Sequence, residues 1–273
     1  MNRTKRVCFL TVLTILLLLI VQSYPQINDT WPYIGELTEY TLSYFGVPAS
    51  KICFHVVDTL RLNNRLIFQV NVAAKSIGFW SKLFKLDNIY ESYIDYHHLL
   101  PLKFSKKVRQ KNIKQNWMIS FDQANHIAQI DSEKVWPIPE NCHNFFSMIY
   151  TIRQLNFADI DSFELYLDVE SIVWKTVIRK IAREIICLPS GNYKAIRFSL
   201  DFIPVEKGKK RSWKTDLLTN RMANENSELS IWFSDDAFRM MLMIEYKHSI
   251  FSTKVQLSKI YRSISLKKYD GDI

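Results

Sequence analysis

Glycine and proline are scarce in this sequence, with only 6 glycines and 8 prolines among 273 residues. This composition is not that of a collagen-like, low-complexity or disordered chain. It leaves no Gly-rich loop of the kind that binds phosphate, and no Pro/Gly-rich linker that would separate domains. Because 48% of the residues are hydrophobic, the chain can bury a large core. We therefore predict one domain.

Cysteine and histidine are also few, with 4 and 6 residues respectively, and no Cys-x-x-Cys or His-x-His pattern occurs. We therefore predict no metal site and no cofactor. Cys53, Cys142 and Cys187 are the cysteines beyond the N-terminal region. Cys53 and Cys187 both fall in predicted strands and are the best candidates for a disulfide outside the cytosol. The alternative is three free, buried thiols.

No pattern of catalytic residues is present. Ser190 precedes Gly191, but the Gly-x-Ser-x-Gly elbow is absent, and a turn accounts for Pro189–Asn192. Asp235 and Asp236 are adjacent acids in a predicted hairpin turn, which is more typical of a solvated turn than of a calcium site. Because no nucleophile and base converge, we predict that the protein is not an enzyme.

The longest uncharged apolar run is Phe9–Val21, and Arg3, Lys5 and Arg6 precede it. It is too short for an ordinary transmembrane helix and typical of the core of a secretory signal. We predict a signal peptide over residues 1–23 and a periplasmic or secreted protein. The alternative is an uncleaved membrane anchor.

The remaining chain alternates like β-strands, with one exception at Asn144–Leu155. There Phe145, Ile149 and Ile152 recur at helical spacing, and Asn141 or Asn144 can cap the helix. A short amphipathic helix among strands must pack against a sheet. We predict a mainly β fold: a single antiparallel meander sheet of about a dozen strands, curled into a partly closed barrel, with this helix on its concave side.

Three further predictions concern the bounds of the β domain and two segments that connect its strands. The β domain spans residues 24–262, and residues 263–273 form a flexible tail. Ile77–Phe84 is either a short helical turn or a loop against the sheet. Pro204–Glu228 is polar and without clear periodicity, which predicts a long mobile loop.

Several segments together resemble domain-of-unknown-function family 3108. They are GELTEYTLSYFGVPAS, AAKSIGFWSKLFKLDNIYESYID, LLPLKF, FFSMIYTIRQL, PSGNYKAIRF and SIWFSDDAFRMMLMIE, in this order between Gly35 and Leu257. The resemblance implies an exported bacterial protein with a mostly antiparallel, barrel-like sheet. It implies no catalytic residues, because the family has no agreed ones.

Two binding surfaces are candidates. The first is a concave pocket that would wrap a lipid tail, formed by Tyr40, Tyr44, Phe54, Phe68, Phe145, Ile149, Trp174, Phe198 and Trp232. The alternative is that these side chains fill the core. The second is a basic hairpin whose Lys106, Lys107, Arg109 and Lys111 would contact anionic lipid, glycan or a protein partner. The alternative is a solvated edge hairpin whose lysines prevent aggregation.

These observations predict a non-catalytic envelope protein that binds or carries an apolar or amphiphilic component such as a lipid or glycolipid. The alternative is a structural or assembly partner in the envelope, with a filled core and no small ligand. The net charge is +9, and it is +6 without Arg3, Lys5 and Arg6, because 33 basic residues then face 27 acidic ones. Such a charge permits contact with a membrane surface, whereas nucleic acid is not expected for an exported protein.

Overall fold

The computed structural model describes residues 33–62, 64–83, 85–110, 112–131, 134–209, 216, 223, 225, 228–248 and 251–262. The predicted signal peptide or anchor and the predicted tail lie outside these residues, as does most of the predicted loop 204–228. The first strands are β1 (Leu37–Tyr44), β2 (Val47–Leu62), β3 (Arg65–Ser76), β4 (Leu86–Asp95), β5 (Pro101–Gln110), β6 (Ile113–Asp122), β7 (Ile127–Ile130) and β8 (Lys134–Pro137). The later strands are β9 (Cys142–His143), β10 (Ser162–Val169), β11 (Ile172–Leu188), β12 (Gly191–Pro204), β13 (Glu228–Ser234), β14 (Met241–His248) and β15 (Phe251–Arg262). Two helices are described, α2 (Gly78–Leu83) and α3 (Phe145–Gln154).

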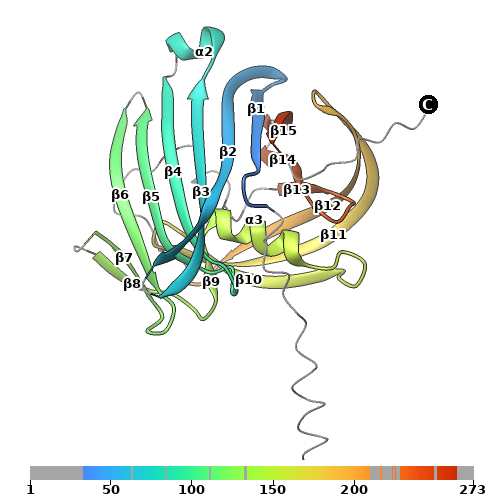
Figure 1. Ribbon diagram of the computed structural model, residues 1–273. Helices are drawn as coiled ribbons and strands as arrows, with labels where there is room; N and C mark the ends of the chain where they lie inside the picture. The colour runs from blue at the N-terminus through green and yellow to red at the C-terminus, as the bar shows by residue number, and fades with distance from the viewer. Residues whose placement is uncertain are drawn as a thin grey trace, which may run out of the picture. The chain divides into compact units, whose positions relative to one another are not determined.

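The strands form one 15-stranded sheet in the order β8-β7-β6-β5-β4-β3-β2-β1-β15-β14-β13-β12-β11-β10-β9 (Figure 1). The sheet thus has a first arm, β1–β8, and a second arm, β9–β15, joined by the antiparallel pair β1–β15. The free edges are β8 and β9, so the sheet is not closed. The predicted mainly β, partly closed meander is confirmed, with more strands than expected. One pair, β9–β10, is parallel, which makes the sheet mixed.

The inner face of the first arm is apolar because of the two-residue alternation along each strand. In β2, Ile52, Phe54 and Val56 are buried. Phe54 lies opposite Val72 of β3, and Val72 lies opposite Tyr90 of β4. Because of these pairings, the apolar residues of β2, β3 and β4 form one continuous surface.

Helix α3 begins with a complete capping box. Asn144 Oδ1 accepts a hydrogen bond from Ser147 N at 2.8 Å, and Ser147 Oγ accepts one from Asn144 N at 3.0 Å. Of the two predicted caps, Asn144 is therefore the one used. The predicted ridge of Phe145, Ile149 and Ile152 is buried, as expected.

The helix is buried on more than the one predicted face, because the sheet curves around it (Figure 1). The Phe146 ring contacts Phe54 and Phe104, and the Tyr150 ring contacts Phe68, all in the first arm. Just after the helix, the Phe157 ring contacts Phe198 and Phe233 of the second arm, at centroid distances of 4.9 and 5.8 Å. The segment of α3 thus fills the space between the two arms.

Antiparallel pairing places the connections of the first arm at two ends. The two-residue β1–β2 turn, helix α2 and the β5–β6 turn lie at one end, called here the α2 end. The β2–β3, β4–β5 and β6–β7 turns lie at the other end, called here the rim. The Ile77–Phe84 segment is the short helical turn rather than the loop, as Gly78–Leu83 shows.

Two further features of the described residues are the state of the cysteines and the length of the helices. Cys53, Cys142 and Cys187 are free thiols, so the predicted Cys53–Cys187 disulfide is not formed. Neither described helix is long and apolar enough to cross a membrane.

Candidate functional site

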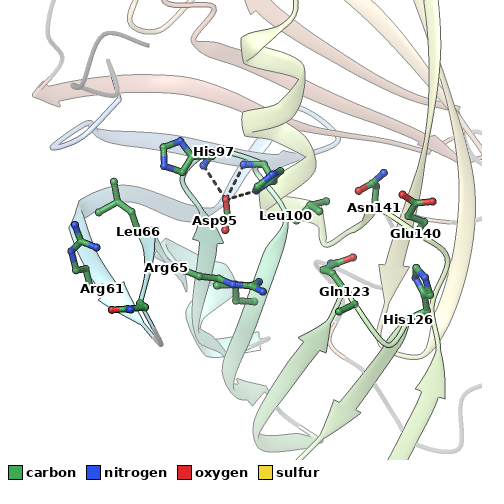
Figure 2. A pocket seen from close by; sticks show the side chains of 14 residues that line it. Arg61, Arg65, Leu66, Asp95, His97, Leu100, Gln123, His126, Glu140 and Asn141 are labelled. Carbon is green, nitrogen blue, oxygen red and sulfur yellow. Dashed lines mark hydrogen bonds and ion pairs between the residues drawn. The ribbon is translucent and has the colours of Figure 1, made fainter. Parts of the chain in front are cut away.

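A cavity of about 880 Å³ opens at the rim, and we call it the rim cavity (Figure 2). Its volume is within the range of small-molecule sites. Three turns that are distant in sequence supply most of its lining, together with the segment before β9. The lining residues are Arg61, Asn64, Arg65, Leu66, Asp95, His97, His98, Leu100, Leu102, Gln123, Ala124, His126, Glu140 and Asn141.

Asp95 organises the turn that carries His97 and His98. Its Oδ1 accepts hydrogen bonds from His97 N at 2.9 Å and from His98 N at 2.8 Å, and it lies 3.1 Å from His98 Nδ1. Burial acts to raise the pKa of the Asp95 carboxyl, but the hydrogen bonds from His98 and His97 outweigh it and lower the pKa. Asp95 is therefore an ionised carboxylate whose role is to hold the turn.

The rim cavity carries positive charge from the β2–β3 hairpin. Arg61 and Arg65 are exposed, and neither forms an ion pair with any residue that the structure describes. Figure 2 shows Arg65 extending toward the middle of the lining residues, while Glu140 lies on the far side. Guanidinium groups bind carboxylate and phosphate through paired N–H donors. The arrangement is therefore suited to an anionic group.

Two other kinds of lining residue complete the site. His97, His98 and His126 supply imidazoles that donate or accept hydrogen bonds. Leu66, Leu100 and Leu102 supply apolar contact. Within the described part of the chain, no three His, Cys, Asp or Glu side chains gather closely enough to hold a metal ion.

The nine residues of the predicted ring pocket lie elsewhere. All are buried except Tyr44, which is half-buried, and none lines the rim cavity. Trp232 pairs with Arg197, whereas Phe198 pairs with Ile231, so Trp232 and Phe198 point to opposite faces of the sheet. The structure therefore does not bring the nine side chains together around one pocket.

The predicted basic hairpin is only partly a surface. Lys107 and Arg109 are exposed, and Lys111 lies outside the described residues. Lys106, however, is 1% exposed, so its predicted role at an anionic surface is wrong. Lys106 alternates with the buried Phe104 and Val108, so it lies on the inner face of β5. This alternation is visible in the sequence and could have predicted its burial.

Lys106 belongs to a buried polar cluster that sequence reasoning missed. Its Nζ forms ion pairs with Glu170 and with Asp216, the latter at 3.2 Å. Tyr90 OH donates to Asp216 Oδ1 at 2.9 Å, and Asn88 Nδ2 donates to Tyr90 OH at 2.7 Å. Because Lys106 is in the first arm and Glu170 is in the β10–β11 turn, the cluster links the two arms. These residues are distant in sequence, so no local pattern indicates the cluster.

His143, in β9 just before α3, makes stability depend on pH. Burial lowers its pKa to about 4 from an ordinary 6.5, although a backbone hydrogen bond with Leu99 opposes the shift. Below pH 6.5 the unfolded chain therefore binds a proton that the folded chain does not. We expect the free energy of unfolding to fall by about 3 kcal/mol between pH 7 and pH 4 from this residue alone.

Urea denaturation across this pH range measures the effect. His143→Gln cannot ionise, so the difference in stability between it and the native chain should shift in favour of the variant as the pH falls. A difference that stays constant between pH 7 and pH 4 would show that His143 is not the responsible group.

The family comparison agrees with the fold. A family model described as "Protein of unknown function (DUF3108)" matches residues 39–257, which is more than half of the chain. The chain belongs to the DUF3108 family. The resemblance found in the sequence segments is thus confirmed. The match includes the β4–β5 and β6–β7 turns of the rim cavity and all of the buried polar cluster. A search of the curated proteins found no match.

Solved structures also resemble this DUF3108 domain. A beta-barrel-like protein of the DUF1849 family from Brucella abortus has a TM-score of 0.54 and 8% sequence identity, and the match covers 84% of this chain and 98% of that one. A candidate lipoprotein from Parabacteroides distasonis has a TM-score of 0.37 and 7% identity, with 84% and 96% covered. A candidate exported protein from Bacteroides fragilis has a TM-score of 0.36 and 10% identity, with the same coverage. The Brucella protein shows that the barrel-like fold of the DUF3108 domain also occurs in another family.

Proposed function

We propose that this protein is a non-catalytic component of the cell envelope that binds an amphiphile by an anionic head group in the rim cavity. The observation that carries the proposal is the convergence of Arg61 and Arg65 with His97, His98 and His126 around a cavity of about 880 Å³. Leu66, Leu100 and Leu102 provide apolar contact for the first carbons of the chain that follows the head group.

Export is the second part of the proposal. Its support is the N-terminal pattern of Arg3, Lys5 and Arg6 before the apolar run Phe9–Val21. A cleaved signal would release the protein into the periplasm or the medium, and an uncleaved one would keep it at the membrane. In the periplasm or at the membrane, the protein would have access to envelope lipids and glycolipids.

Binding is favoured over catalysis by the kinds of residue in the cavity. None of the fourteen described residues that line it is a serine, threonine, cysteine, tyrosine or lysine, so these residues supply no hydroxyl, thiol or amine nucleophile. The Asp95 carboxylate already accepts hydrogen bonds from the backbone N–H groups of His97 and His98. Glu140 forms no ion pair with a described residue.

A second candidate function is a structural or assembly role in the envelope without a small ligand. The packing of the predicted ring residues into the core favours it. Addition of a partner strand at β8 is disfavoured, because this edge strand is short and contains Lys134 and Pro137. An assembly partner would therefore bind a surface rather than add a strand at β8.

Calorimetric titration of the full chain with decyl phosphate, kept below its micelle concentration, tests the proposed function. We expect saturable binding to one site, weakened about tenfold by Arg65→Ser, since a charge-assisted hydrogen bond contributes about 1.5–3 kcal/mol. Lys247→Ser, which removes an exposed basic side chain of β14 in the second arm, is the control and should leave binding unchanged. No saturable binding, or equal loss in both variants, would contradict the proposal.

A further inference from the structure

Large apolar side chains are exposed together at the α2 end. Phe45 is 58% exposed, Val47 52%, Phe79 71% and Leu83 53%. They come from the β1–β2 turn and from α2, which lie side by side (Figure 1). The Tyr44 ring lies 4.8 Å from Phe45 and 6.3 Å from Trp80, measured between centroids. We call these residues the aromatic tip: Tyr44, Phe45, Val47, Phe79, Trp80 and Leu83.

Phenylalanine is an unfavourable residue type at position 45 of the β1–β2 turn. Phe45 has φ 52° and Gly46 has φ 75°, so both residues of this two-residue hairpin turn are left-handed. Such turns favour Asn-Gly, whereas a bulky side chain at positive φ is strained. The fold alone therefore does not account for an exposed phenylalanine at this position, and strained positions of this kind are often functional.

Basic residues surround the aromatic tip. Lys82 and Lys85 flank the end of α2, and Arg109 and Lys114 come from the neighbouring β5–β6 hairpin. All four are exposed, and none forms an ion pair within the described ranges. The nearby acids are already paired, Glu39 with Lys51 at 2.9 Å and Asp87 with Lys75 at 3.8 Å. This end of the molecule is therefore apolar at its tip and positive around it.

We propose that the aromatic tip docks on an anionic lipid bilayer, with its side chains at the boundary of head groups and acyl chains and the surrounding lysines and arginine on lipid phosphates. Aromatic residues are favoured at this depth, and basic residues near the surface add electrostatic attraction. A second copy of the chain is a poorer occupant, because face-to-face association would bring the like-charged groups together. The tip lies at the opposite strand ends from the rim cavity, so this inference stands apart from the proposed function.

Hydrogen–deuterium exchange of the full chain, with and without vesicles, tests the proposal by location. The vesicles contain phosphatidylethanolamine with phosphatidylglycerol, and vesicles of phosphatidylcholine alone are the comparison. We expect slower exchange over residues 44–47 and 78–83 with the anionic vesicles, whether or not exchange also slows over 123–126 at the rim, where the proposed function places an anionic head group. This readout separates the tip from any contact made by the N-terminal apolar run. Protection elsewhere only, or none, would overturn the proposal.

Co-sedimentation of variants with the same vesicles gives the second test. Phe45→Asn combined with Phe79→Ser should weaken vesicle binding through the tip at least about tenfold. In the same double variant, the vesicles should no longer slow hydrogen exchange over residues 44–47 and 78–83. Phe45→Asn alone should not lower the melting temperature, because asparagine suits the turn. Ile185→Ser removes an apolar side chain that is 60% exposed on β11, and it should change neither readout. Slowed exchange of residues 44–47 and 78–83 that persists in the double variant would overturn the proposal. Slowed exchange that appears without vesicles as the protein concentration rises would also overturn it and would indicate self-association.

Discussion

Replacing Arg153 by methionine should lower the free energy of unfolding by about 3–5 kcal/mol, since it leaves a buried carboxylate without its partner. Arg153 is 1% exposed and binds Glu36 through two parallel hydrogen bonds, Nη1 to Oε1 at 2.9 Å and Nη2 to Oε2 at 2.7 Å. Its Nη2 also donates to the Phe238 carbonyl at 3.2 Å, and its guanidinium lies 3.8 Å from the Tyr33 ring centroid. One side chain thus ties α3 to the start of β1 and to the β13–β14 turn.

Urea denaturation of the single and double variants separates the ion pair from the packing. Glu36→Leu together with Arg153→Met removes both charges, so the double variant should recover more than half of the loss. If the two single losses simply add in the double variant, or if Arg153→Met costs less than about 1 kcal/mol, the pair does not hold these elements together.

Replacing Lys106 by methionine should also cost about 3–5 kcal/mol at pH 7, because Glu170 and Asp216 stay buried when the ammonium is removed. Lys106, Glu170 and Asp216 are 1%, 3% and 0% exposed. Since Glu170 lies in the second arm and Lys106 in the first, the loss would weaken the contact between the arms.

Lys107→Met is the matched control. Lys107 is the next residue of β5, it points to the opposite face, and it is exposed. We expect its replacement to change stability by less than about 0.5 kcal/mol. Equal melting temperatures for the two variants would show that the buried cluster does not contribute to stability.

Local patterns in the sequence were enough to predict helix α3 and most of the strands, although β8 and β9 were not predicted. Phe145, Ile149 and Ile152 repeat at helical spacing, and Asn144 caps them, so α3 forms as predicted. Alternation in β2 and β12 likewise predicts which side chains face inward. These signals are local because a strand or helix is specified by its own period and its own caps.

Features that depend on distant residues could not be predicted. The β1–β15 pairing and the open edges at β8 and β9 depend on long-range register, which no turn or period encodes. The rim cavity joins turns that are distant in sequence, such as those of Arg65, His98 and His126. Lys106 is an intermediate case, because its inward position was readable from β5 but its partners Glu170 and Asp216 were not.

Native mass spectrometry of the full chain purified from the cell envelope tests the proposed function most directly. We predict that the native protein carries a bound anionic amphiphile, that Arg65→Ser loses it, and that Phe79→Ser at the α2 end keeps it. A protein of bare mass, a ligand retained by Arg65→Ser, or a stoichiometric protein partner in place of a lipid would contradict binding at the rim cavity.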